Sequence, residues 1–283
     1  MKQYLDLCTK ILDKGVWVTN VRTGQRCLTI INADMEYDCS EGHIPMLTTK
    51  KTYWRSAIAE MLGYLRGYDN AKQFEAIGCN TWNANANDNK DWLANPYRKG
   101  KGDMGRVYGV QGTHWINSHQ EVTNQLKTIY EKLCQGIDDR RLIMTFWNPG
   151  ELDMGCLPAC MHTHTFSLLE DTLYLTSYQR SIDVPLGLPF NMIQTTWLLR
   201  IMAQITGHKA GKVFHKMVNV HVYENQLELL KEQITREPYE SPKLIINPNI
   251  RSLESLENDM VVGADNEILD YQHHPAISYP FSV

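Results

Sequence analysis

The sequence predicts an α+β fold in which helices pack against a large mixed β-sheet within a single domain. Segments with helical periodicity alternate with segments whose polarity changes every second residue. The chain has 283 residues, 43% of them hydrophobic, which is enough to fill a sizeable core. No repeat, low-complexity tract or linker divides it. We therefore expect one domain over residues 1–283.

Four segments carry apolar residues at helical spacing. The first is amphipathic and predicts a surface helix, whereas the last is apolar on most faces and predicts a buried one. Three of them run into a glycine, the residue that most often ends a helix. The segments are 4–12, 53–66 before Gly67, 122–133 before Gly136, and 191–205 before Gly207.

Three segments have the alternating pattern of strands. Residues 163–169 and 172–181 flank a glutamate–aspartate pair at 170–171, which suits a hairpin turn. Residues 213–223 alternate again. Period two places the side chains of His221 and Tyr223 on one face of that strand, so both can reach a single ligand.

Residues 78–112 lack periodicity and are rich in asparagine and glycine, which predicts a loop-rich surface insertion. Trp82 and Tyr108 stand at its two ends, and we expect the insertion to be partly functional. The run Gly100-x-Gly102-x-x-Gly105 matches a dinucleotide-binding motif as text. It follows no apolar strand and no βαβ unit surrounds it, so its glycines are read as turn residues.

Cysteine and histidine also gather near residue 160 without predicting a metal site. Cys156, Cys160, His162 and His164 do not have a usual structural-zinc spacing. The two histidines are two apart on an expected strand, where they would share a face away from the cysteines. We expect no metal.

The composition excludes several classes of protein. A formal charge of −4 gives no general attraction to nucleic acid or to an anionic membrane. Seven cysteines without framework spacing indicate reduced thiols. The N-terminus carries no secretory signal, and no apolar run reaches membrane length. We expect a soluble cytoplasmic protein.

Cys160 carries the strongest functional signal. A thiol is a good nucleophile only as a thiolate, which a nearby guanidinium such as that of Arg180 favours. Arg180 and Ser181 also suit a phosphate, and Asn191 offers an amide to a base. Without this context Cys160 would be read as a small buried hydrophobe. The set predicts a nucleotide held over a nucleophilic sulfur.

These residues resemble the folate-dependent thymidylate synthases of bacterial type, and the resemblance runs from Met1 to Val283. One departure is that Ala159 stands between the proline and the nucleophile. Two others, Tyr53 and Asn85, lie on the folate side. The motifs that carry the resemblance are Arg22-Thr23-Gly24, Thr48-Thr49-Lys50, Arg55 with Glu60, Arg106 to Gly109, Asp139-Arg140-Arg141, Leu157 to His162, Tyr178 to Asn191, and His221-Val222-Tyr223.

The resemblance implies an activity and a set of roles. The enzyme would be a methyltransferase that converts dUMP to dTMP, with 5,10-methylenetetrahydrofolate as donor of carbon and hydride and dihydrofolate as by-product. Cys160 would add to uracil C6, with no metal involved. The implied catalytic residues are Cys160, Glu60, Tyr108, Arg180, Asp183 and Asn191. Those for dUMP are Arg22, Arg140, Arg141, Arg180, Ser181, Asp183, Asn191, His221 and Tyr223, and those for folate are Trp82, Asp183, Leu186, Gly187, Phe190 and Ser282.

The resemblance also implies a homodimer. Arg140 and Arg141 would each reach the phosphate in the partner's site, although on their own they could be a solvated charge cluster. On a strand the two side chains would face opposite ways. The C-terminal residues 279–283 would close as a lid over both ligands, where simple docking on the core is the alternative.

Two rival functions stay open at the level of sequence. A sister enzyme of the same fold hydroxymethylates a cytosine nucleotide, and it would carry an acid where this chain has Asn191. Weak binding of RNA is the other, and the negative charge argues against it as the main role.

Overall fold

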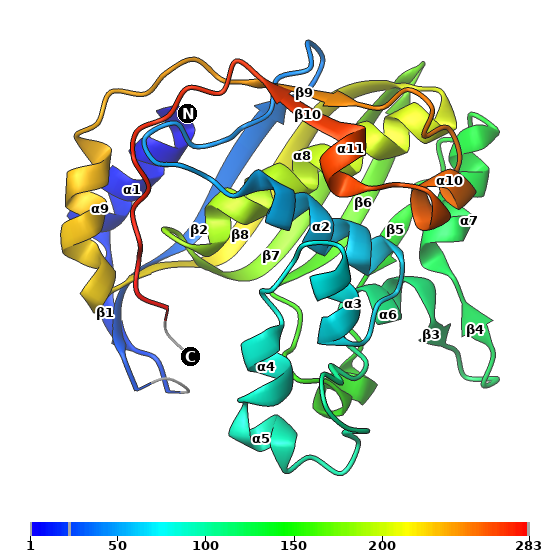
Figure 1. Ribbon diagram of the computed structural model, residues 1–283, viewed down its shortest axis with the longest axis horizontal. Coiled ribbons are helices and arrows are strands. Elements are labelled where there is room, and N and C mark those ends of the chain that lie inside the picture. The colour runs from blue at the N-terminus through cyan, green and yellow to red at the C-terminus, as the bar shows by residue number, and fades with distance from the viewer. Residues whose placement is uncertain (1, 22–23, 282–283) are drawn as a thin grey trace.

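The computed structural model describes residues 2–21 and 24–281, and its centre is a mixed six-stranded sheet (Figure 1). The strand order is β1-β2-β8-β7-β6-β5, with β7 and β8 parallel and the other neighbours antiparallel. The predicted α+β class is confirmed. The strands are β1 Val16–Thr19, β2 Arg26–Asp38, β5 Ile143–Thr145, β6 Met161–Leu169, β7 Thr172–Asp183 and β8 Lys209–Tyr223.

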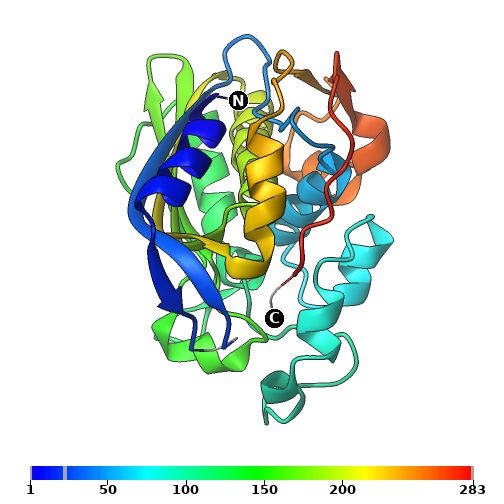
Figure 2. The ribbon, with the colours of Figure 1, turned by 90° about the vertical axis from the view of Figure 1, so that its left-hand side faces the viewer.

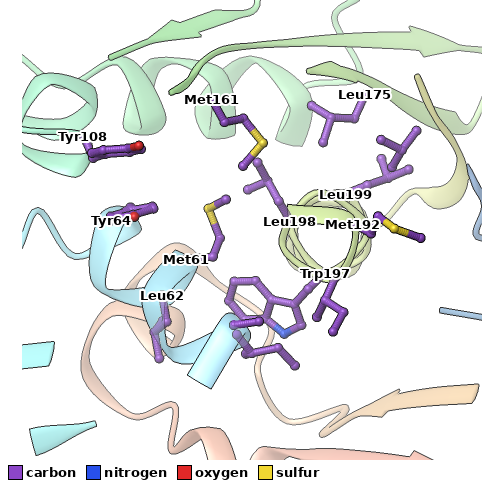
Figure 3. Close-up of a cluster of buried hydrophobic side chains, with 14 of the residues drawn as sticks. Met61, Leu62, Tyr64, Tyr108, Met161, Leu175, Met192, Trp197, Leu198 and Leu199 are labelled. Carbon is purple, nitrogen blue, oxygen red and sulfur yellow. The ribbon is translucent and has the colours of Figure 1, made fainter. Parts of the chain in front are cut away.

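Helix α8 (Gly187–Thr206) lies against one face of the sheet and is buried along most of its length, as its apolar sequence predicts. Trp197 is fully buried, and its indole Nε1 donates to Asn266. Helix α2 (Trp54–Leu65) crosses α8 and brings Met61 and Tyr64 into the same core (Figure 3). Gly207 ends α8 with a φ of 79°, a conformation that glycine adopts without strain.

The opposite face of the sheet carries exposed apolar side chains. Figure 2 shows the strands on one side of the molecule and α2 on the other. Ile31 of β2 is 69% exposed, Val218 of β8 53% and Tyr178 of β7 43%. Because these residues lie on three neighbouring strands, they form a surface that the chain itself leaves uncovered.

The remaining elements surround this core. Their bounds are α1 Lys2–Lys14, α3 Ala71–Ala76, α4 Asn83–Asn87, α5 Lys90–Leu93, α6 Gly109–Thr113, β3 Trp115–Ile116, β4 Val122–Thr123, α7 Gln125–Cys134, α9 Leu227–Ile234, β9 Lys243–Ile246, α10 Leu253–Asn258, α11 Val262–Asp265 and β10 Asn266–Leu269, with short 3-10 turns at Pro149–Met154 and Glu224–Gln226. No helix among the described residues is long and apolar enough to span a membrane.

The predicted helices are present, with two starts displaced. Helix α7 begins after Asn124, whose side chain accepts a hydrogen bond from the backbone N–H of Lys127, while Val122 belongs to β4. Helix α8 begins four residues before the predicted start at Asn191. Periodicity identified the apolar turns of each helix, but the residues at which a helix begins and ends depend on local capping.

The insertion at 78–112 is more ordered than predicted. It contains α4, α5 and α6, and Trp92 is fully buried with its indole Nε1 donating to the carbonyl of Asp103. Its glycines act at turns, as expected. Gly105 has a φ of 70°, and a Cβ there would lie 2.2 Å from the carbonyl oxygen of Met154, so only glycine fits.

The hairpin between β6 and β7 is confirmed, whereas the expected pairing of two histidines is wrong. Glu170 takes a φ of 55° at the turn. A bulge between Met161 and Thr163 interrupts the alternation of β6, so His162 and His164 do not share a face. His164 is fully buried beside Ser177, while His162 packs half-buried against Trp147.

Candidate active site

Cys160 stands directly before β6, and Arg180 of β7 holds it from one side. The guanidinium Nη2 of Arg180 lies 3.7 Å from the Cys160 sulfur. The same side chain donates to the carbonyls of Ala159 and Pro158, at 3.0 and 2.9 Å, and so shapes the loop before the nucleophile. The backbone N–H of Arg180 also donates to the Cys160 carbonyl. Arg180 is thus the cation beside the Cys160 sulfur.

The other cysteines offer no comparable environment. Burial raises the pKa of the thiols of Cys8, Cys39, Cys79 and Cys156 to about 12, so they stay protonated. Among the described cysteines Cys160 alone is half-buried. These differences separate it from Cys156, four residues earlier.

Tyr108 lies over the same loop. Its hydroxyl oxygen accepts a hydrogen bond from the backbone N–H of Cys160 at 2.9 Å. Its ring stacks on Tyr64, with centroids 4.6 Å apart, and burial raises the pKa of its phenol well above the usual value. Its backbone has a φ of 40°, which a side chain of this size adopts rarely and which often marks a functional position.

Glu60 projects from α2 towards α8. Gln194 donates to its Oε2 at 2.6 Å and Thr81 to its Oε1 at 2.5 Å. Burial raises the pKa of the carboxyl, and the two hydrogen bonds oppose that rise without cancelling it. The indole N–H of Trp82 lies near the same carboxyl but has no partner within hydrogen-bond distance in the part of the chain that the structure describes.

Asn191, in the first turns of α8, is held between two glutamines. Gln179 donates to its Oδ1, and its own Nδ2 donates to Gln194, both at 2.8 Å. The sequence reasoning missed both glutamines. The sequence pattern could have identified both. Gln194 is three residues after Asn191 on an otherwise apolar helix, and Gln179 is a polar residue on a strand face that packs inward.

His221 and Tyr223 share one face at the end of β8, as predicted. Their rings lie 5.2 Å apart, and His221 Nδ1 contacts the side-chain oxygen of Asn219 at 2.8 Å. Burial lowers the pKa of His221 to about 4, so its imidazole is neutral near pH 7. Asn20 reaches the hydroxyl of Tyr223.

Asp183 ends β7 beside the start of α8. Its carboxylate accepts from the backbone N–H of Leu186 and from Gln226 Nε2, and burial raises its pKa. Leu186, Gly187 and Phe190 are half-buried here, while Trp82 is 3% exposed and packs within the aromatic core. A partly exposed apolar wall beside a hydrogen-bonding carboxylate suits a flat ring that carries hydrogen-bonding groups at its edge.

Several predicted residues stand apart from this group. Arg140 and Arg141 are exposed in a turn before β5 rather than on a strand, and Arg141 pairs with Asp139 at 2.9 Å. In the described structure neither contacts Cys160. Arg22 and Ser282 lie outside the described residues. The side chain of Ser181 is half-buried near Gln179.

One cavity lies elsewhere, and no predicted site residue lines it. It measures about 460 Å³ and is lined by Thr172 and Lys209, at the opposite ends of β7 and β8 from the group around Cys160. The described residues contain no cluster of side chains that could hold a metal ion.

Comparison with known proteins decides the family. A family profile described as Thymidylate synthase matches residues 2–283. The chain is 62% identical to a thymidylate synthase of Shewanella pealeana, 61% to one of Pseudoalteromonas translucida and 60% to one of Haemophilus influenzae, each over the full length of both chains. The chain belongs to the thymidylate synthase family.

This membership gives the reaction. The chain is a methyltransferase that converts dUMP to dTMP, with 5,10-methylenetetrahydrofolate as the co-substrate. The acid expected at residue 191 for a cytosine-specific relative is absent, since Asn191 occupies that position.

Proposed function

We propose that Cys160 is the nucleophile that attacks uracil C6 in this reaction. The observation that carries the assignment is the 3.7 Å contact between Arg180 and the Cys160 sulfur. The thiolate forms a bond to C6 and the displaced electron pair moves to C5 and O4, which turns a weak carbon nucleophile into an enolate. The folate supplies a one-carbon unit to C5 and then a hydride to that transferred carbon.

Proton transfer is assigned to Glu60 and Tyr108. Glu60 has a raised pKa and is suited to exchange protons near neutral pH. Tyr108 keeps its hydroxyl hydrogen and lies against Cys160, where it can assist removal of the C5 proton. Loss of the C5 proton expels the folate amine and leaves a methylene group on C5. Hydride addition to that methylene carbon completes the methyl group as the thiolate leaves and the C5–C6 double bond is restored.

The remaining predicted residues hold the ligands. Asn191 presents its amide to the uracil edge, while His221 and Tyr223 bind the sugar hydroxyl from β8. Arg22, Arg180 and Ser181 bind the phosphate. Asp183, Leu186, Gly187, Phe190, Trp82 and Ser282 form the folate side.

The active site is proposed to be shared between two copies of the chain. Arg140 and Arg141 project from an exposed turn, away from the local nucleotide site. The uncovered sheet face with Ile31, Val218 and Tyr178 offers an apolar surface for a second copy. Residues 1–283 are proposed to act as one domain in the cytoplasm, where dUMP is available.

The nucleophile is tested with 5-fluoro-dUMP, which traps the adduct because C5 cannot lose its fluorine as it would a proton. Cys160→Ala should bind the nucleotide but form no covalent complex with it in the presence of folate, as judged by mass spectrometry. Cys156→Ala is the matched control and should form the complex. An adduct on Cys160→Ala, or its loss on Cys156→Ala alone, would refute the assignment.

A further inference from the structure

A continuous row of hydrogen-bonded side chains links Glu60, the proposed acid–base carboxylate, to Asn191, the residue proposed to read the base. Gln194 Nε2 donates to Glu60 Oε2 at 2.6 Å, and Gln194 Oε1 accepts from Asn191 Nδ2 at 2.8 Å. Glu60 and Gln194 are 134 residues apart in sequence and meet where α2 crosses α8. Gln194 is 1% exposed, and both ends of its amide are used within this row.

The carboxylate of Glu60, at one end of the row, determines which atom donates in each of its hydrogen bonds. A carboxylate can only accept, so Gln194 must turn its Nε2 towards Glu60 and its Oε1 towards Asn191. Asn191 must then turn its Nδ2 towards Gln194, which leaves its Oδ1 on the other side. The orientation of the Asn191 amide therefore depends on Glu60, through Gln194.

The opposite flank of Asn191 supports the same orientation. Gln179 Nε2 donates to Asn191 Oδ1 and to the carbonyl oxygen of Ser181, which is also only an acceptor. Gln179 Oε1 lies 2.7 Å from His215 Nε2, so that nitrogen must carry the hydrogen. Each atom of the Asn191 amide has one further bond to offer, an acceptor at Oδ1 and a donor at Nδ2.

We propose that Gln194 is a positioning residue that ties the base-reading amide of Asn191 to the acid–base carboxylate of Glu60. The acceptor and donor left on Asn191 match the N3–H and O4 of uracil. Cytosine offers an acceptor at N3 and a donor at its amino group, so it meets the wrong partner at both positions. This inference rests on the proposed roles of Asn191 and Glu60.

The groups around Glu60 leave its proton affinity sensitive to Gln194. Tyr64, Cys79 and Tyr108 face the carboxyl, and burial raises the pKa of each, so all three stay neutral in the working range of pH. Thr81 and Gln194 make the two largest hydrogen-bond contributions that favour the ionised carboxylate, ahead of Tyr64 and Trp82. Removing either donor should therefore raise the pKa of Glu60.

The test compares two variants that both lose a hydrogen bond to Glu60, of which only one also loses the contact with Asn191. Gln194→Met removes the contacts with both Glu60 and Asn191. Thr81→Val removes the contacts with Glu60 and Cys79 and leaves those of Asn191 in place. Titration calorimetry with dUMP and dCMP gives base selectivity, and the pH dependence of kcat gives the ionisation of Glu60. We expect the acid-side ionisation to move to higher pH in both variants. Selectivity for dUMP should fall roughly three- to tenfold, the worth of one hydrogen bond, in Gln194→Met alone.

A second variant, Gln194→Glu, keeps the test decisive if Gln194→Met does not fold. It retains an oxygen that accepts from Asn191 but places a second carboxyl beside Glu60. Selectivity should be kept while the acid-side ionisation moves to higher pH. Equal effects of Gln194→Met and Thr81→Val on selectivity, or no shift in the pH profile, would overturn the inference while the proposed function stands. A wild-type protein that binds dUMP and dCMP equally would instead refute the proposed role of Asn191.

Discussion

Asn191 illustrates how a single amide becomes specific at the scale of the residue. A free asparagine can turn its oxygen and nitrogen either way, and would then accept uracil or cytosine alike. Here Gln179 and Gln194 each occupy one atom of the amide, at 2.8 Å, so a reversed amide would oppose donor to donor and acceptor to acceptor. The base selectivity proposed for Asn191 thus depends on Gln179 and Gln194 as much as on Asn191 itself.

Asn191→Asp should reduce kcat/KM for dUMP by about 10²- to 10⁴-fold and abolish the preference over dCMP, because a carboxylate cannot donate to uracil O4. Competition between the two nucleotides in one assay measures the ratio. Unchanged selectivity would mean that another residue reads the base.

At the scale of the element, the inward face of the sheet carries neutral histidines. His164 of β6 and His215 of β8 are fully buried, and burial lowers their pKa values to about 3 and about 4. His221, further along β8, has a pKa of about 4 for the same reason. An unfolded histidine titrates near 6.5, so between pH 6.5 and 4 the unfolded chain binds more protons than the folded one.

Stability should therefore fall as the pH drops from about 6.5 towards 4, by up to about 1.4 kcal/mol per pH unit for each of these histidines. Urea unfolding at a series of pH values measures the slope. His164→Gln should flatten the slope by about one histidine's share, whereas a change at the exposed His119 should not. A slope that is the same in wild type and His164→Gln would contradict this account.

At the scale of the whole molecule, the C-terminal segment reaches the neighbourhood of Asp183, which is proposed to lie on the folate side of the site. It runs past α9 (Figure 1), where the hydroxyl of Tyr279 donates to Gln233 at 2.6 Å. Gln226 Nε2 donates both to the carbonyl of Pro280 and to Asp183 Oδ2. The segment is therefore docked as far as Pro280, and Phe281 beyond it is 65% exposed. Tyr279 and Pro280, the first two residues of the lid predicted over 279–283, are therefore docked on the core in this structure.

Deletion of Val283, which lies outside the described residues, should spare dUMP binding and thermal stability while sharply reducing turnover, because a cap acts only once both ligands are bound. Calorimetry, thermal unfolding and the rate of dihydrofolate formation separate these effects. Normal turnover, or unfolding of the truncated protein, would exclude a lid.

The shared active site predicts complementation between two inactive chains. Cys160→Ala lacks the nucleophile and Arg140→Ala lacks the phosphate contact supplied to the partner. A mixed dimer regains one site with both groups intact, so activity should return to at most about a quarter of the wild-type value after random exchange of subunits. Sedimentation of the mixture checks the dimer. No recovery in a verified mixed dimer would show that Arg140 acts within its own chain.

The sequence by itself determined the class of fold and the elements around the buried helix, and it singled out Cys160 and Arg180 as the proposed nucleophile and its arginine. These follow from periodicity and from short motifs, since Cys160 directly precedes one strand of a hairpin and Arg180 lies on the other. It did not determine where α7 and α8 begin, the bulge in β6, or the order within the insertion, because caps and burial of single residues decide them.

Only the tertiary structure brought Gln194 to Glu60 and Gln179 to Asn191. The first pair depends on how α2 crosses α8, and the second on which face of β7 packs against that helix. Glu60 and Gln194 are 134 residues apart in sequence, so no local pattern encodes their contact. Packing of the whole core determines how the two helices cross.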